Sequence, residues 1–130
     1  MKVVALDYGR ARTGVAVSDP TGTVARPLTV VRHAATAVGL AELGRVIEAE
    51  RPDRVVIGLP ITLRGEHGEQ ARETERFAEA LRKAVDCPVE CFDERFTTAL
   101  AERDEGGEAP EDARAAAHLL SSYLAWASGK

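Results

Sequence analysis

The sequence predicts an α/β fold in which one mixed five-stranded sheet carries helices on both of its faces. The chain has 130 residues, which suits a single domain (1–130) built around one modest core. Up to Arg32 it reads as three extended segments joined by short turns, and after that apolar extended runs alternate with helical periodicity. Antiparallel strands followed by strand–helix units produce a mixed sheet that is covered on both sides.

The N-terminal part of the chain is expected to form three strands. KVVALDY (2–8) is a β-branched apolar run that ends at Gly9, and GVAVSD (14–19) follows the short polar connection Gly9–Arg12. These two runs read as a β-hairpin. A third extended segment, Pro27–Arg32, comes after the turn residues DPTG (19–22).

Helices and strands are expected to alternate in the rest of the chain. The helices show apolar residues every three or four positions, and prolines at 52 and 88 stop the first two of them. In order, the elements are a helix through Leu40, Leu43, Val46 and Ile47, the strand RVVIGLP (54–60), a helix through Phe77, Leu81 and Val85, the strand VECF (89–92), a brief helix at Phe96 and Leu100, and a final helix through Ala116, Leu119, Leu120, Tyr123 and Leu124. This order is that of the ribonuclease H-like fold, although a fold alone does not define a function.

The composition excludes some classes of protein. Acidic residues number 21 against 17 Lys plus Arg, a formal charge of −4, so the chain does not coat nucleic acid by charge alone. A nucleic-acid enzyme remains open, because metal ions can supply positive charge at a carboxylate site. The chain contains no apolar run of about 18 residues, the length needed to cross a membrane. The N-terminal MKVVALDYGR lacks a signal-peptide core, so a cytoplasmic protein is expected.

The two cysteines, Cys87 and Cys91, are expected to be ordinary thiols that are partly buried. Their segment CPVEC reads as extended, and four residues of strand span about 13 Å. A disulfide needs Cα atoms within about 7 Å, so an extended segment keeps these two apart. Their spacing also differs from that of a CxxC zinc or redox motif, and a reducing compartment fits both residues.

Three acidic positions are candidates for chemistry, although each has an ordinary structural explanation as well. Asp7 ends an apolar strand, where its carboxylate needs a metal, an arginine or several N–H donors, and the hairpin turn could supply the last. Asp93 and Glu94 follow a strand at the edge where open α/β sheets place their sites, but a solvated turn would look the same. Asp112 is expected in the first turn of the last helix, where it could simply interact with the helix dipole.

Taken together, Asp7, Glu94 and Asp112 predict a divalent-metal site. Hard cations such as Mg²⁺ or Mn²⁺ prefer carboxylate oxygens that converge from separate elements. Two such ions about 4 Å apart can activate a water and stabilise the leaving oxygen in phosphodiester hydrolysis. Because three ionised acids repel one another, the site without its cation is expected to be less stable.

Four segments of the chain carry a resemblance to a known family. DYGRARTGVAVSD begins at Asp7, GLPITLRGEHGEQARETERFAEAL at Gly58, DERFTTALAE at Asp93 and DARAAAHLLSSYL at Asp112. In this order they resemble the YqgF family of RuvC-like nucleases, which are described as nucleases of pre-16S ribosomal RNA. The resemblance covers almost the whole chain, and it implies a ribonuclease H-like fold and a divalent-metal phosphodiesterase site.

The resemblance also assigns the metal ligands. By position, the family's acids fall on Asp7, on Asp93 or Glu94, and on Asp112. Glutamate has the longer reach and suits a ligand at the end of a strand, so Glu94 is preferred and Asp93 is its substitute. Both assignments imply Mg²⁺ or Mn²⁺ as the cofactor.

The chain departs from the family pattern at two places. In the first hairpin, where the family carries Lys-Arg, Ala11 precedes Arg12, and the loop EGGEAPED (105–112) is acidic and short where the family's is basic. Both departures remove charge that would contact phosphates, so they bear on substrate affinity and shape more than on the metal site.

Residues around the acids are candidates for binding nucleic acid. Arginines could pair with phosphate bidentately, or neutralise the acids in the free protein, and both roles are compatible. Exposed N–H groups of a glycine loop before a helix starting near Glu69 could hold a phosphate, although such a loop is often merely flexible. A histidine there could touch substrate or protonate a leaving group, although a lone loop histidine is more often just exposed. The candidates are Arg10, Arg12, Gly65, His67, Gly68 and Arg95.

These observations predict a metal-dependent nuclease whose partner is nucleic acid. The resemblance favours processing of the 5′ end of precursor 16S ribosomal RNA, in ribosome biogenesis. The first alternative is a Holliday junction resolvase acting on branched DNA, which would be a homodimer because it must nick two strands. The second is a non-catalytic RNA- or ribosome-binding module. DYGRARTGVAVSD also resembles the phosphate loop of actin-like ATPases, but those close a nucleotide between two such domains. The sequence leaves open whether the protein is a monomer or a homodimer.

Overall fold

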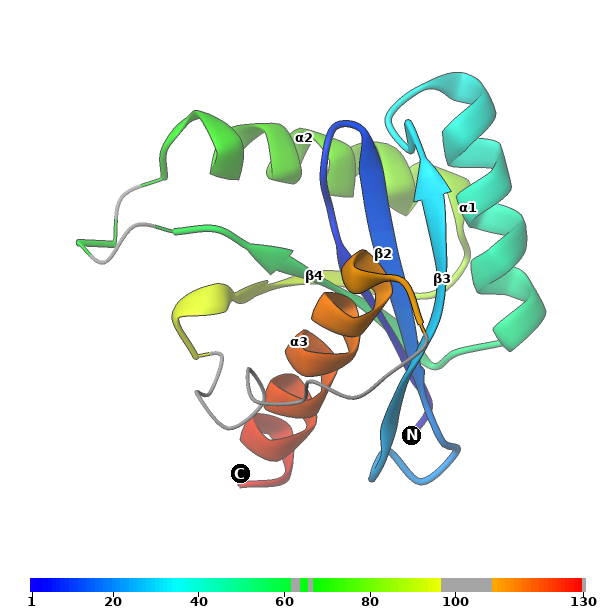
Figure 1. Ribbon diagram of the computed structural model, residues 1–130, viewed down its shortest axis with the longest axis vertical. Coiled ribbons are helices and arrows are strands. Elements are labelled where there is room, and N and C mark those ends of the chain that lie inside the picture. The colour runs from blue at the N-terminus through cyan, green and yellow to red at the C-terminus, as the bar shows by residue number, and fades with distance from the viewer. Residues whose placement is uncertain (62–63, 66, 97–108, 130) are drawn as a thin grey trace.

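Five strands form one mixed sheet in the computed structural model, which describes residues 1–61, 64–65, 67–96 and 109–129 (Figure 1). The sheet has the order β3-β2-β1-β4-β5. β1 pairs antiparallel with β2 and parallel with β4, β2 pairs antiparallel with β3, and β4 pairs parallel with β5. The strands are β1 (Val3–Asp7), β2 (Arg12–Ser18), β3 (Ala25–Arg32), β4 (Arg54–Leu59) and β5 (Val89–Asp93). The mixed five-stranded sheet predicted from the sequence is confirmed.

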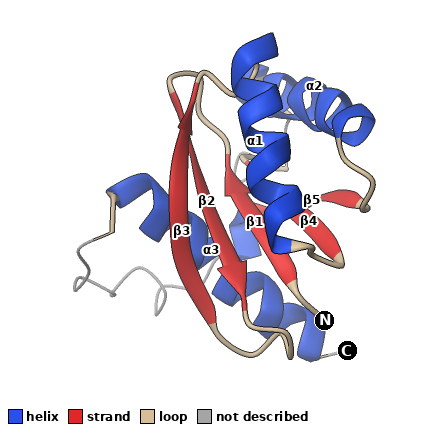
Figure 2. Cartoon of the chain, turned by 90° about the vertical axis from the view of Figure 1, so that its right-hand side faces the viewer, coloured by secondary structure: helices blue, strands red, loops and turns tan. Residues whose placement is uncertain are grey.

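Helices cover both faces of this sheet, as expected. α1 (Ala37–Glu50) and α2 (Glu69–Ala84) lie on one face, and α3 (Glu111–Ser128) lies on the other (Figure 2). A 3₁₀ turn, η1 (Glu94–Phe96), follows β5. The predicted brief helix at Phe96 and Leu100 therefore appears only as this turn, and its remainder lies outside the described residues. No helix in the described part of the chain is long and apolar enough to span a membrane.

The helix boundaries follow from local signals. α1 begins after Thr36, whose hydroxyl accepts a hydrogen bond from the Gly39 N–H at 3.1 Å. It ends at Arg51, which adopts a left-handed conformation (φ 49°) immediately before Pro52. α2 begins at Glu69, where the sequence places it, and ends well before Pro88. Pro52 thus stops α1 as predicted. The prediction that α2 includes Val85 and is stopped by Pro88 is wrong, because the backbone is already extended at Val85.

The sheet separates two apolar cores, one on each of its faces. On β1, Val4 and Leu6 face the core under α1 and α2, whereas Val3 and Ala5 face the core under α3. This alternation follows from the two-residue period of a strand. Asp7 continues the series of Val3 and Ala5, so its side chain belongs to the α3 face.

The hairpin differs slightly from the expectation. β2 begins at Arg12 rather than at residue 14, because Arg12 and Thr13 already pair with Arg32 and Val31 of β3. Pairing with β3 therefore extends β2 to Arg12, which the sequence alone assigns to the polar connection.

Both cysteines are free and half-buried, as predicted. Cys91 lies in β5, whereas Cys87 lies in the bend before it, so β5 is shorter than the extended segment CPVEC predicted from the sequence. Burial raises the pKa of each thiol above its ordinary value.

Gly14 allows α3 to approach the sheet closely. A Cβ atom at Gly14 would lie 1.8 Å from the carbonyl oxygen of Asp112 and 2.4 Å from its carbonyl carbon. Both are backbone atoms of the first turn of α3, so neither can move without moving the helix. Glycine at this position therefore sets how near α3 lies to β2.

Replacing this glycine should loosen the docking of α3. We expect Gly14→Ala to lower the free energy of unfolding by about 3 kcal/mol or more, because overpacking against backbone cannot be relieved by a rotamer change. Denaturant unfolding measures the effect. Gly44→Ala is the matched control: its Cβ would meet only the Ala84 carbonyl oxygen at 4.0 Å, and alanine within α1 should raise stability by about 0.5–1 kcal/mol. Equal stability of Gly14→Ala and the wild type would contradict this packing.

Candidate active site

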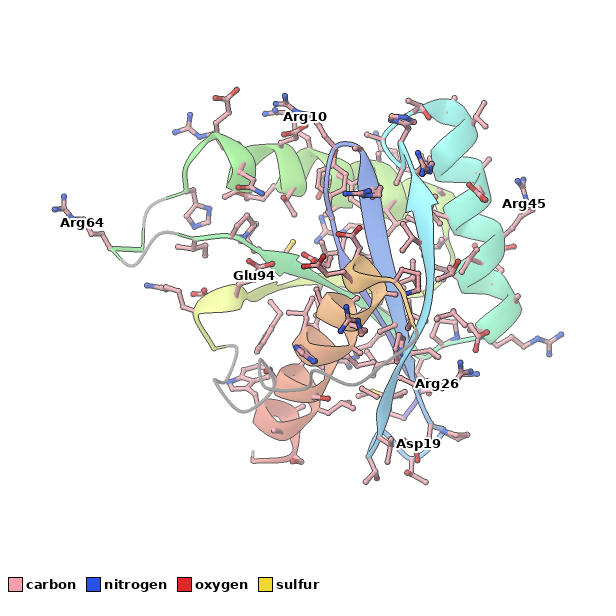
Figure 3. The ribbon with its side chains drawn as sticks, viewed as in Figure 1. Arg10, Asp19, Arg26, Arg45, Arg64 and Glu94 are labelled. Atoms are coloured by element: carbon pink, nitrogen blue, oxygen red, sulfur yellow. The ribbon has the colours of Figure 1, made fainter. Side chains whose placement is uncertain are left out.

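The three predicted acids lie at one edge of the sheet, on the face covered by α3. Asp7 ends β1 and is paired in register with Gly14, against which the Asp112 backbone packs. Asp112 is therefore placed beside Asp7 by the close approach of α3. Glu94 follows directly after β5 and is labelled in Figure 3.

Gly58 of β4 provides the space in which the Glu94 side chain lies. A Cβ atom at Gly58 would lie 2.6 Å from Glu94 Oε1 and 3.1 Å from Glu94 Cγ. Gly58 follows Ile57, the register partner of Leu6, so it stands beside Asp7 in the neighbouring strand. The Glu94 carboxylate thus crosses over β4 toward β1.

Asp7 and Glu94 are carboxylates with no compensating donor among the described residues. Burial raises the pKa of Asp7, and the nearby Asp112 raises it further. Burial also raises the pKa of Glu94, with repulsion from Asp7 and then Asp93 adding to it. No described residue donates a hydrogen bond or forms an ion pair with either carboxylate, so Asp7 is not the turn-bonded acid that was the alternative explanation.

Asp93 and Asp112 instead hold arginines. Arg95 bonds Asp93 with its backbone N–H at 2.9 Å and with Nε and Nη2 at 2.8 Å and 2.6 Å, which holds the pKa of Asp93 below its usual range. Arg12 Nε lies 3.1 Å from Oδ2 of Asp112. Because Asp93 is already neutralised by its neighbour and Glu94 is not, the contacts favour Glu94 over Asp93 as a cation ligand.

The donor set fits a hard divalent cation, although it is not gathered in one cluster. Among the described residues, no three His, Cys, Asp or Glu side chains are close enough together to hold a metal ion. Two half-buried carboxylates without donors nevertheless leave negative charge that a cation would neutralise. Asp7 and Glu94 are available for this as they stand, whereas Asp112 is engaged by Arg12.

The residues expected to bind nucleic acid divide between two places. Arg10 Nε pairs with Glu73 at 2.9 Å and His67 Nδ1 with Glu75 at 3.0 Å, and both partners belong to α2, on the other face of the sheet. Arg10 thus turns away from the acids (Figure 3). Arg12 contacts Asp112, and Arg95 contacts Asp93, the substitute candidate for Glu94.

The glycine loop lies beside Arg95. Gly65 has a left-handed backbone (φ 81°), and a Cβ there would lie 3.4 Å from Nη1 of Arg95. Gly68 precedes α2 without a side-chain cap, so the first N–H groups of that helix are not bonded by a cap. Every cationic residue proposed for phosphate binding, Arg10, Arg12, His67 and Arg95, already has a carboxylate partner.

Two glycines important to the site were missed from the sequence. Gly14 and Gly58 interrupt buried strands, and a glycine inside a strand is itself a signal of close approach. Tyr8 follows Asp7 and stacks on Phe77 with ring centroids 4.4 Å apart. Tyr8 lines a cavity of about 400 Å³, which belongs to the α2 side of the sheet and not to the carboxylates. Gly9, Arg10, Glu69, Gln70 and Glu73 complete its lining.

The arrangement of strands and helices defines a class by its fold, the RuvC-like members of the ribonuclease H-like fold. RuvC of T. thermophilus, solved in complex with a Holliday junction substrate, superposes with a TM-score of 0.69 over 99% of this chain and 96% of its own. The two chains are 17% identical, so this likeness concerns the fold. The four sequence segments that resemble the YqgF family predict this same fold.

The chain belongs to the RuvX family, also called YqgF. The family profile described as "RuvX: Holliday junction resolvase" matches residues 1–126. A relative from Anaeromyxobacter sp. (strain Fw109-5), named "Putative pre-16S rRNA nuclease", is 41% identical over 132 residues, covering 95% of this chain and 96% of its own. One of the same name from Chloroflexus aurantiacus (strain J-10-fl) is 45% identical over 101 residues, 78% of this chain but only 66% of its own length. The resemblance seen in the sequence is thereby confirmed.

Glu94 and Asp93 can be compared directly by isosteric substitution. We expect Glu94→Gln to reduce metal-dependent cleavage more than 100-fold, because it removes ligand charge with little change in volume. Asp93→Asn should cost about 10- to 100-fold at most, the range typical of groups that only support a metal ligand. Rates at saturating Mn²⁺ measure both effects. A larger loss in Asp93→Asn would reverse the assignment.

The raised pKa of Asp7 should appear as a pH dependence of stability. The metal-free native state holds the Asp7 proton more tightly than the unfolded state, so this contribution is fully present in acid and is lost as pH rises through the native pKa. We therefore expect Asp7→Asn to gain stability relative to the wild type as the pH rises from about 4, the ordinary pKa of an aspartate, through the raised native pKa of Asp7. Denaturant unfolding with chelator measures the difference. A difference independent of pH would contradict the electrostatic account.

Proposed function

We propose that this protein is a divalent-metal-dependent nuclease that hydrolyses phosphodiester bonds at the 5′ end of precursor 16S ribosomal RNA. The observation that carries the proposal is a pair of half-buried carboxylates, Asp7 and Glu94, which repel each other and have no donor among the described residues. Asp112 lies beside them. The names of the full-length relatives support precursor rRNA as the substrate.

Each acid has a separate role in holding the cation. Asp7 and Glu94 would contribute carboxylate oxygens from β1 and from the turn after β5, and Asp112 would contribute a third from α3. Bound Mg²⁺ or Mn²⁺ would activate a water and stabilise the leaving oxygen. The protein's own contribution is rigidity, because Gly14 and Gly58 hold two of these acids against the sheet.

The acidic balance of the chain has a consequence for substrate binding. With a formal charge of −4 and three acids at the site, phosphate is repelled until cations are present. Affinity for RNA should therefore come from the bound metal and from a few arginines, and it should be selective for shape rather than strong on any nucleic acid.

A Holliday junction resolvase is the second candidate, favoured by the description of the family profile. A resolvase must nick two strands symmetrically, which requires two copies of the site related by a two-fold axis. The rRNA nuclease needs only one copy. The two functions therefore differ in substrate and in oligomeric state, and one assay can separate them.

Cleavage of matched substrates tests the proposal. The panel contains a precursor 16S RNA 5′ end, a four-way DNA junction and linear controls, each with Mg²⁺ or Mn²⁺. We expect cleavage of the RNA, and its loss by at least 100-fold in Asp7→Asn, since the substitution removes a ligand charge but little volume. Circular dichroism of Asp7→Asn should match that of the wild type, which separates loss of the site from loss of the fold.

The alternative outcomes are distinct. Paired, symmetric nicks confined to the junction would identify a resolvase and would require a dimer in solution. Absence of cleavage on every substrate would leave an RNA- or ribosome-binding module. Wild-type cleavage by Asp7→Asn would show that the site lies elsewhere.

A further inference from the structure

Asp112, one of the three proposed metal ligands, forms an ion pair with Arg12. Arg12 Nε lies 3.1 Å from its carboxylate, and the two side chains are 58% and 38% exposed. An ion pair this exposed contributes a factor of about five or less to an equilibrium, so a competing anion can separate it. The pair is therefore easily exchanged.

A second arginine lies directly beside the first. Arg12 of β2 and Arg32 of β3 are register partners, and residues directly opposite each other in an antiparallel pair project from the same face. That face is the one covered by α3, because Gly14 and Ala16 of the same strand contact α3 and its core. Both arginines thus lie on the face of the sheet to which Asp7 belongs and which α3, with Asp112, covers.

Arg32 differs from Arg12 in its partners within the described part of the chain. It is exposed, and no described acidic side chain forms an ion pair with it. Like charges directly opposite each other on neighbouring strands repel. Asp112 pairs with Arg12, so it neutralises only one of these two cations. An anion with several oxygens could contact both, and phosphate matches the planar donors of arginine.

We propose that Arg12 and Arg32 together bind one phosphate of the substrate, and that this phosphate draws Arg12 away from Asp112 so that Asp112 can join Asp7 and Glu94 around the cation. This rests on the proposed nuclease function and adds a phosphate subsite and an order to it. Substrate and metal then strengthen each other's binding, because both compete with the same ion pair. By linkage the two effects are equal in size.

Mn²⁺ affinity of the free protein tests the exchange without any cleavage. We expect Arg12→Gln to tighten Mn²⁺ binding about two- to fivefold, the range set by an exposed ion pair. In an Asp112→Asn background the same substitution should change nothing. Electron paramagnetic resonance of free Mn²⁺ gives both affinities. Unchanged or weaker Mn²⁺ binding by Arg12→Gln would overturn the proposal.

RNA binding in the presence of chelator tests the phosphate subsite. The probe is the precursor 16S RNA 5′ end. Arg12→Gln and Arg32→Gln should each lower the slope of log affinity against log salt, and the double variant should lower it by about 0.7–0.9, the loss of the one phosphate contact that the two arginines share. Arg45→Gln is the matched control, because Arg45 is an exposed arginine of α1 on the opposite face (Figure 3), and its slope should equal the wild type's. A slope of Arg32→Gln equal to that of Arg45→Gln would overturn the subsite.

The two proposals fail in different ways. If Asp7→Asn abolishes cleavage and Mn²⁺ binding while Arg12→Gln and Arg32→Gln behave as Arg45→Gln does, the nuclease stands and the phosphate subsite falls. If the wild type binds no Mn²⁺, both fall together.

Discussion

The close contact between the first turn of α3 and Gly14 of β2 is the constraint on which the site depends. It brings the backbone of Asp112 against the strand next to Asp7, at a distance that any side chain at position 14 would forbid. Gly58, on the neighbouring strand β4, likewise leaves the space in which the Glu94 side chain lies. Two strand glycines, which are unfavourable to a sheet on their own, thus create the space in which acids from distant segments meet.

This arrangement leaves the free protein with uncompensated charge. Asp7 and Glu94 are partly removed from water and gain no donor among the described residues, so the pKa of each carboxyl is raised. Asp93 and Asp112 avoid that cost by pairing with Arg95 and Arg12. A bound cation would relieve the first pair, and at 100 times its dissociation constant it would add about 2.7 kcal/mol to stability.

Most of the fold could be predicted from the sequence, because periodicity and prolines are local signals. The end of α1 before Pro52 and the strand around Val55 follow from neighbours along the chain, whereas α2 ends at Ala84, four residues before Pro88. The three acids were also recognisable, through the family segments. The partners of the arginines were not, since pairing of Arg12 with Asp112 depends on how α3 docks. The choice between Asp93 and Glu94 likewise depends on the position of Arg95 relative to a strand end.

The central claim is that this edge of the sheet binds a divalent cation between Asp7 and Glu94. Anomalous scattering from crystals soaked in Mn²⁺ tests it most directly. The account predicts an anomalous peak contacted by the carboxylates of Asp7 and Glu94, absent from crystals of Asp7→Asn. A peak on Asp93 instead, or no peak at this edge at saturating Mn²⁺, would contradict it.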